Sequence, residues 1–201
     1  MIHKLLRNKK VILASASPRR KEIFALLGIS AYIIPADINE IITQENPEIQ
    51  AKRNASQKAD VVKAKVTNDA LIVAADTLVA IDSHILGKPS NEEEASKFLK
   101  LLAGKTHFVY TSLCIDYNGM RDVSCERTLV HFANLSDAEI NAYIETGEPM
   151  DKAGAYGIQG YGAQFIEKVD GCYFNVMGFP VRKFYEMLTT ILQKEYNENI
   201  S

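Results

Sequence analysis

Two adjacent arginines, Arg19 and Arg20, begin a predicted helix that follows directly on the short apolar run Lys10–Ala14. Ser17 and Pro18 are typical of the first positions of a helix, where free backbone N–H groups form an anion site. Cations in this turn oppose the helix dipole, which costs roughly a few tenths of a kcal/mol each unless an anion is bound. Because the planar guanidinium matches phosphate oxygens, the segment predicts a phosphate site. The alternative is a surface helix start with solvated arginines.

Acidic side chains follow two of the predicted strands. Asp76 comes directly after Leu71–Ala75, the most apolar short run, and we expect it at the carboxyl end of a central strand, where open α/β sheets bind ligands. Asp37 and Glu40 follow the second predicted strand, Tyr32–Ile34. Carboxylates near phosphate-binding arginines indicate Mg²⁺, which takes one or two carboxylates together with substrate phosphates. The alternatives are a turn-capping role for Asp76 and solvated loop positions for Asp37 and Glu40.

Two lysines and a glycine-rich segment complete the candidate residues. Lys88 lies in a stiff Gly-Lys-Pro turn, and Lys152 leads into Gly154–Gly162. A constrained lysine is a suitable point charge for phosphate, although a solvated surface position is its commoner fate. Gln159 presents a donor and an acceptor together, which suits the imide edge of a pyrimidine, or else it faces solvent. The glycines permit close backbone approach to a ligand, and neither a P-loop nor a dinucleotide fingerprint is present.

The composition describes an ordinary globular chain and excludes several classes of protein. It has 201 residues, of which 47% are apolar and 24% charged, with a net charge of −2. The charge balance provides no electrostatic footprint for nucleic acid, and no run approaches the roughly 20 apolar residues that cross a membrane. The three cysteines form no C-x-x-C pair, which favours a reducing compartment and predicts a cytoplasmic protein.

The elements that must position these residues alternate between strand and helix in the first half, and a long hairpin turning at Asn118-Gly119 follows. A capping box at Ser136 and Glu139 opens a later helix, and a second hairpin is expected over Asp170-Gly171. The pattern indicates an α/β fold with a mixed sheet. The predicted strands are Lys10–Ala14, Tyr32–Ile34, Leu71–Ala75 followed by an extended stretch over Thr77–Ile81, Thr106–Tyr117, 120–133, Gln164–Val169 and Cys172–Val176, and the predicted helices start at Ser17-Pro18, Asn46-Pro47, Asn91, Ser136 and Pro180.

Five motifs, in order along the chain, resemble those of the Maf proteins. They are Leu13–Arg20, Ala75–Thr77, Gly87–Pro89, Gly104–His107 and Asp151–Gly160. The resemblance runs from about Val11 to the last helix. It implies a single domain over residues 1–201, with the fold of the inosine triphosphate pyrophosphatases: a long mixed β-sheet flanked by helices, and two lobes with a central cleft.

The resemblance also implies an activity, the release of pyrophosphate and a monophosphate from a nucleoside triphosphate with the help of Mg²⁺ or Mn²⁺. Arg19, Thr77 and Gln159 are as in the branch that acts on dTTP and UTP, and are implied to select the substrate. Asp76 is the implied general base and metal ligand, Glu40 shares the metal, and the triphosphate is bound by Ser15, Arg20, Lys88 and Lys152. A homodimer is suggested. The alternatives are a pyrophosphatase for non-standard nucleotides and a nucleotide-binding regulator of cell division, at septum formation, with little catalysis.

Overall fold

A seven-stranded mixed sheet forms the centre of the computed structural model, which describes residues 1–38, 42–43, 45–67 and 69–198. The strand order is β2-β1-β3-β5-β6-β7, and β4 pairs with the far part of β3. β1 runs parallel to β2 and β3, and the remaining pairs are antiparallel. The strands are β1 (Val11–Leu13), β2 (Tyr32–Ile33), β3 (Leu71–Ile81), β4 (His84–Leu86), β5 (Thr106–Tyr117), β6 (Met120–Phe132) and β7 (Ile166–Asp170).

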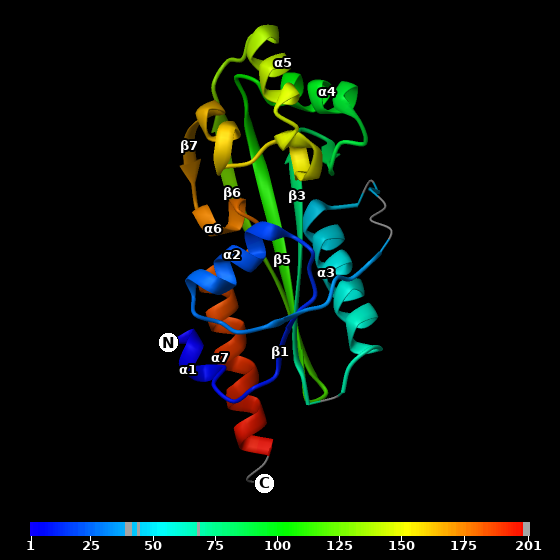
Figure 1. Cartoon of the computed structure of the whole chain (residues 1–201), viewed down its shortest axis with the longest axis vertical. Helices are drawn as coiled ribbons and strands as arrows, with labels where there is room; N and C mark the ends of the chain where they lie inside the picture. The colour runs from blue at the N-terminus through cyan, green and yellow to red at the C-terminus, as the bar shows by residue number, and fades with distance from the viewer. Residues whose placement is uncertain (39–41, 44, 68, 199–201) are drawn as a thin grey trace.

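Helices flank the sheet, and they gather at its two ends (Figure 1). In the lower half of the view, α3 (Pro47–Lys63) lies on one side of the long strands, and α1 (Ile2–Leu5), α2 (Pro18–Leu26) and α7 (Val181–Glu198) lie on the other. The upper end holds α4 (Glu92–Leu102), α5 (Asp137–Glu145) and the 3₁₀ turns η1 (Glu148–Asp151), η2 (Ala153–Ala155) and η3 (Gly160–Phe165). The expected α/β fold, with a mixed sheet flanked by helices, is therefore confirmed.

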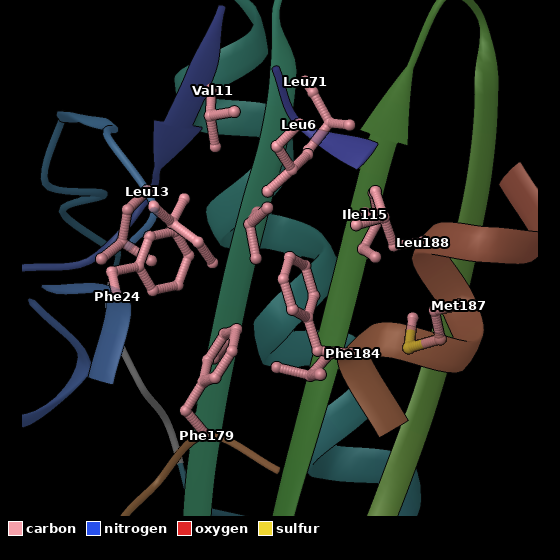
Figure 2. Close-up of a cluster of buried hydrophobic side chains, with 14 of the residues drawn as sticks. Leu6, Val11, Leu13, Phe24, Leu71, Ile115, Phe179, Phe184, Met187 and Leu188 are labelled. Atoms are coloured by element: carbon pink, nitrogen blue, oxygen red, sulfur yellow. The ribbon is translucent and has the colours of Figure 1, made fainter. Parts of the chain in front are cut away.

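Each end of the sheet has its own hydrophobic cluster. In the lower cluster, Phe24 of α2 packs on Phe179 and Phe184, and all three are buried against β1, β3 and β5 (Figure 2). The upper cluster packs α4 and α5 on the other ends of the same long strands, with Phe165 and Tyr143 in edge-to-face contact at 5.0 Å. Because β3, β5 and β6 run through both clusters, the two lobes share one continuous sheet.

The hairpin turn and the N-caps of three helices, which rest on short sequence patterns, are confirmed. The β5–β6 hairpin turns at Asn118 and Gly119, which have φ of 48° and 80°, values that a tight hairpin turn requires. Asn46 and Asn91 cap α3 and α4 through their side-chain oxygens. Ser136 forms both halves of the predicted capping box at the start of α5.

The predicted strand Cys172–Val176 is wrong, because residues Tyr173–Val176 form the short helix α6. The segment bonds to side chains on the face of the sheet and makes no ladder with β7. The Cys172 N–H donates to Thr128 Oγ1 over 3.1 Å, and the fully buried Asn175 donates from Nδ2 to the Val109 carbonyl over 3.0 Å. Thr111 Oγ1 in turn donates to the Asn175 carbonyl over 2.9 Å. Side-chain partners on β5 and β6 therefore decide the conformation of this segment.

Candidate active site

A gap in the sheet exposes one edge of β3 at its middle. β1 pairs with Leu71–Val73 only, and β4 joins the same edge at Val79–Ile81, so within the described chain no strand pairs with residues 74–78 on that side. β5 continues along the opposite edge, with Asp76 facing Ser112. The prediction that Asp76 ends a strand is therefore wrong, since β3 runs straight through it. The open edge arises because β1 stops at Leu13.

Two side chains of α3 hold the carboxylate of Asp76, which is only 2% exposed. Lys58 Nζ donates to Asp76 Oδ1 over 2.6 Å, and Asn54 Nδ2 donates to Asp76 Oδ2 over 3.0 Å. Lys58 and Asn54 are themselves buried. A buried carboxylate requires such compensation, because removing its charge from water is otherwise costly. The two bonds fix the position of both carboxylate oxygens.

Sequence reasoning missed Asn54 and Lys58, although the helix contains a signal that points to them. Gln50, Asn54 and Lys58 are spaced four residues apart and lie on one face of α3, where all three are buried. The next row consists of Ala51, Ala55 and Ala59, which are fully buried and allow the helix to approach the sheet closely. A polar row beside a row of alanines therefore marks a buried face with a function beyond packing.

The turn after β1 is organised around Arg20. Its guanidinium donates from Nε to the Gly178 carbonyl over 2.8 Å, from Nη1 to Ser15 Oγ over 3.0 Å, and from Nη2 to Thr77 Oγ1 over 3.0 Å. Ser17 occupies the N-cap position of α2, but its side chain caps no described backbone N–H, and its own N–H donates to Ser15 Oγ over 3.2 Å. Arg20 thus links Ser15 to Thr77. Thr77 directly follows Asp76 on β3, so the two side chains point to opposite faces of the sheet.

A cleft of about 630 Å³ brings these groups together, and its size suits a small-molecule ligand. The turn of residues 15–20 and the strand residues 76–79 both line it. Lys58 contributes from α3, Lys88 from the turn after β4, and Asp151 from the upper lobe. The cleft therefore brings Arg19 and Arg20 together with Asp76.

Some sequence candidates lie elsewhere. Lys152 and Gln159 are not among the described residues that line the cleft, and neither is Asp37, which is exposed. Lys152 Nζ donates to the Glu148 carbonyl and to Asp151 Oδ1, both over 2.7 Å. Glu40 lies outside the described residues.

Positive charge from both lobes acts on Asp151. Partial burial would raise the pKa of its carboxyl group, but the hydrogen bond from Lys152 and the charges of Lys152 and Arg19 outweigh burial and lower the pKa below its ordinary value. Arg19 lies on α2 in the lower lobe and is half-buried. Its charge therefore reaches across the cleft to the upper lobe.

Tyr156 forms part of the wall of the cleft and is fixed from behind by His107. Its hydroxyl group lies 2.7 Å from His107 Nε2, and both side chains are buried. Burial, with a smaller contribution from the charge of His131, lowers the pKa of His107 to about 3. His107 is therefore neutral at ordinary pH and has a structural role.

The described residues contain no group of three or more His, Cys, Asp or Glu side chains that would form a complete metal site. Asp76 nevertheless supplies a hard carboxylate donor in the cleft, as a magnesium ion that completes its shell with phosphate oxygens and water requires. The donor chemistry thus fits a divalent cation that is bound together with a phosphorylated substrate.

Within the described part of the chain, no helix is long and apolar enough to cross a membrane.

Comparisons with known proteins identify relatives over most of the chain. The profile of the family described as "Maf-like protein" matches residues 10–191. A protein of Caldicellulosiruptor saccharolyticus named dTTP/UTP pyrophosphatase is 47% identical, over 92% of this chain and 94% of its own length. Proteins of Syntrophomonas wolfei and Aquifex aeolicus with the same name are 46% and 44% identical, over 91% and 89% of this chain and 100% and 94% of their own lengths.

A solved structure shares the fold. The Ham1 protein of Staphylococcus aureus superposes with a TM-score of 0.54, over 93% of this chain and 100% of that one. Only 14% of the residues are identical, so the likeness concerns the arrangement of the elements. A long sheet with helices at both ends is therefore found in a protein of quite different sequence.

Proposed function

The chain belongs to the Maf family, and on that premise we propose that it hydrolyses dTTP and UTP to the monophosphate and pyrophosphate. The observation that carries the proposal is the carboxylate of Asp76, held by Lys58 and Asn54 in the same cleft as the turn of residues 15–20. Relatives that are 44–47% identical and named dTTP/UTP pyrophosphatase support the choice of substrate.

The proposed reaction is attack of water on the α-phosphorus. The water oxygen forms a bond to the α-phosphorus, the bond to the bridging oxygen of the β-phosphate breaks, and pyrophosphate leaves with that oxygen. Asp76 accepts the proton of the water as general base. Lys58 and Asn54 keep the carboxylate in place for this transfer, since each bonds to one of its oxygens.

The triphosphate is proposed to lie along the positive side of the cleft. Ser15 and Lys88 line it directly, and they offer a hydroxyl group and an ammonium group to the phosphate oxygens. Arg20 contributes its charge while it holds Ser15 and Thr77. Lys152 joins them by exchanging its bond to the Glu148 carbonyl for one to phosphate.

A divalent cation, Mg²⁺ or Mn²⁺, is the proposed cofactor, held by Asp76 and Glu40 together with the substrate phosphates. Such an ion would neutralise phosphate charge and polarise the bond that breaks. The hard oxygen donor of Asp76 supports an ion that is bound together with the phosphates of the nucleotide.

Base selection is assigned to Arg19, Thr77 and Gln159. A pocket that makes hydrogen bonds discriminates strongly, because the wrong base leaves buried polar groups unpaired. Thr77 supports this role through its fixed hydroxyl group, which accepts from Arg20 and lies 3.0 Å from Thr111 Oγ1.

A substrate panel with a matched pair of variants tests the proposal. Pyrophosphate release is measured with dTTP, UTP, GTP and modified pyrimidine triphosphates, in Mg²⁺ or Mn²⁺ and after chelation. Asp76→Asn keeps the shape of the side chain and is expected to lower kcat by about 10²–10⁴-fold. The control is Asp82→Asn in the exposed β3–β4 turn, where φ is 52° and asparagine is well tolerated. Nucleotide binding without hydrolysis in the unmodified chain would favour the regulator instead.

Three further assignments accompany the activity. A single folding unit over residues 1–201 is supported by the strands that run through both lobes. A cytoplasmic location is supported by the cysteines Cys114, Cys125 and Cys172, which are all free thiols. A homodimer is supported by the family resemblance alone, and sedimentation analysis tests it.

A further inference from the structure

The carboxylate of Glu148 accepts hydrogen bonds from one end of the glycine-rich segment and from the hydroxyl group of Tyr143, which bonds to an earlier part of that segment. Glu148 Oε1 accepts from the hydroxyl group of Tyr143 over 2.9 Å and from the N–H of Gly162 over 3.1 Å, and Oε2 accepts from the N–H of Tyr161 over 2.9 Å. The hydroxyl group of Tyr143 accepts in turn from the N–H of Gly157 over 3.3 Å. One ionisable side chain and its phenol partner therefore bracket the residues between Gly157 and Tyr161.

Two glycines of this segment lie so close to Glu148 and Tyr143 that a side chain at either position would clash with them. At Gly160, where φ is 75°, an added Cβ would lie 2.5 Å from Glu148 Oε2. At Gly162 an added Cβ would lie 2.8 Å from the hydroxyl oxygen of Tyr143 and 2.5 Å from the Gly157 carbonyl oxygen. A side chain at either position would push the backbone away from Glu148 or Tyr143. The lack of side chains here is what allows the close approach.

Glu148 does not belong to the reacting groups. It is not among the described residues that line the cleft, and both of its carboxylate oxygens already accept hydrogen bonds. Burial raises the pKa of the Tyr143 hydroxyl group, and the adjacent Glu148 raises it further, so the phenol remains a donor at ordinary pH. The pair is therefore suited to hold a backbone conformation.

What the pair holds is the segment that carries Gln159. Gln159 lies between the two anchored stretches, directly before η3, and it is half-buried. The backbone carbonyl of Glu148 also accepts from Lys152 Nζ over 2.7 Å. The proposed base-selecting residue thus lies in a segment that the Glu148 side chain holds, whereas the proposed phosphate-binding residue Lys152 contacts only the Glu148 backbone.

We propose that Glu148 is a positioning residue that fixes Gln159 for recognition of the pyrimidine base, an inference that rests on the proposed function. Glu148→Gln tests it, because an amide in place of the carboxylate loses one acceptor oxygen whichever way it is turned. The ratio of kcat/KM for dTTP to that for GTP is expected to fall about tenfold. The loss of one hydrogen bond to a charged acceptor changes an equilibrium constant by about this factor. We expect the change chiefly in KM for dTTP, with kcat less affected.

A second readout does not depend on activity. In ¹⁵N-labelled protein, Glu148→Gln should speed hydrogen exchange of the Tyr161 and Gly162 amides by about tenfold or more, because these N–H groups lose their charged acceptor. Exchange in β5 should remain unchanged. The matched control is Glu145→Gln, an exposed carboxylate at the end of α5, which should leave both readouts at the wild-type value. Tyr143→Phe removes the phenol partner and should give a change in the same direction.

The two readouts separate the inference from the proposed function. If the wild-type chain hydrolyses neither dTTP nor UTP, the proposed function fails and the exchange rates still test the bracket. If the wild-type chain is active and Glu148→Gln keeps the dTTP preference of the Glu145→Gln control, the inference is wrong. Uniformly faster exchange across the sheet would also overturn it, since that result shows general destabilisation. If Glu148→Gln fails to fold, Tyr143→Phe is measured in its place. A lower dTTP preference and faster exchange of the two amides would support the inference, and wild-type values would overturn it.

Discussion

Replacing Lys58 by methionine removes the ammonium group that lies 2.6 Å from Asp76 Oδ1. The buried carboxylate of Asp76 then keeps the hydrogen bond from Asn54 but loses its positively charged partner. The side chains of Lys58 and Asp76 are 9% and 3% exposed, so solvent cannot replace the lost charge. Breaking a buried ion pair in this way costs about 3–5 kcal/mol of unfolding free energy. For a chain of this size, 1 kcal/mol corresponds to about 2–4 °C, so the expected fall in Tm is about 6–20 °C.

The assay is urea unfolding of four proteins: the wild type, Lys58→Met, Asp76→Asn and the double variant. Removing both charges should restore part of the loss, because the double variant no longer buries an uncompensated carboxylate. We expect a coupling free energy of about 1–3 kcal/mol between the two positions.

Lys52→Met provides the control on the same helix. Lys52 pairs with Glu48 over 2.6 Å, but these side chains are 38% and 48% exposed, so its loss should cost only about 0.3–0.5 kcal/mol. The reasoning would be refuted if Lys58→Met cost no more than this control. Strict additivity in the double variant would refute it as well.

Two further predictions concern the upper lobe. Because burial lowers the pKa of His107 from 6.5 to about 3, the unfolded chain binds a proton that the folded chain does not, and the unfolding free energy should fall by about 2 kcal/mol between pH 7 and pH 5. His107→Gln should remove that part of the pH dependence, as urea titrations at both pH values will show; an unchanged slope would contradict it. Gln159→Glu should lower the preference for dTTP and UTP over GTP, as measured by kcat/KM, and an unaltered preference would remove Gln159 from base selection.

The sequence predicts those features that depend on close neighbours in the chain. The N-caps Asn46 and Asn91, the capping box at Ser136 and the hairpin turn at Asn118-Gly119 are all confirmed, because each depends on residues a few positions apart. The meeting of Arg20 and Asp76 at one cleft, by contrast, is a property of the tertiary structure. It follows from the parallel pairing of β1 with β3, which brings the end of one strand beside the middle of the other.

The partners of Asp76 could not be deduced from its own neighbourhood. Lys58 and Asn54 reach it only because α3 packs on the face of β3, so the pairing depends on tertiary structure. The continuation of β3 through Asp76 is likewise decided by β5, which pairs with it on the far edge. The helix at Tyr173–Val176 depends on Thr128 and Asn175, whose hydrogen bonds no local pattern reveals.

The most direct test of the account is the position of bond cleavage in water labelled with ¹⁸O. Turnover of dTTP by the wild-type chain in this solvent is followed by mass spectrometry of both products. We expect one ¹⁸O atom in the monophosphate and none in the pyrophosphate, because water attacks the α-phosphorus. Label in the pyrophosphate, or release of inorganic phosphate that carries the label, would contradict it.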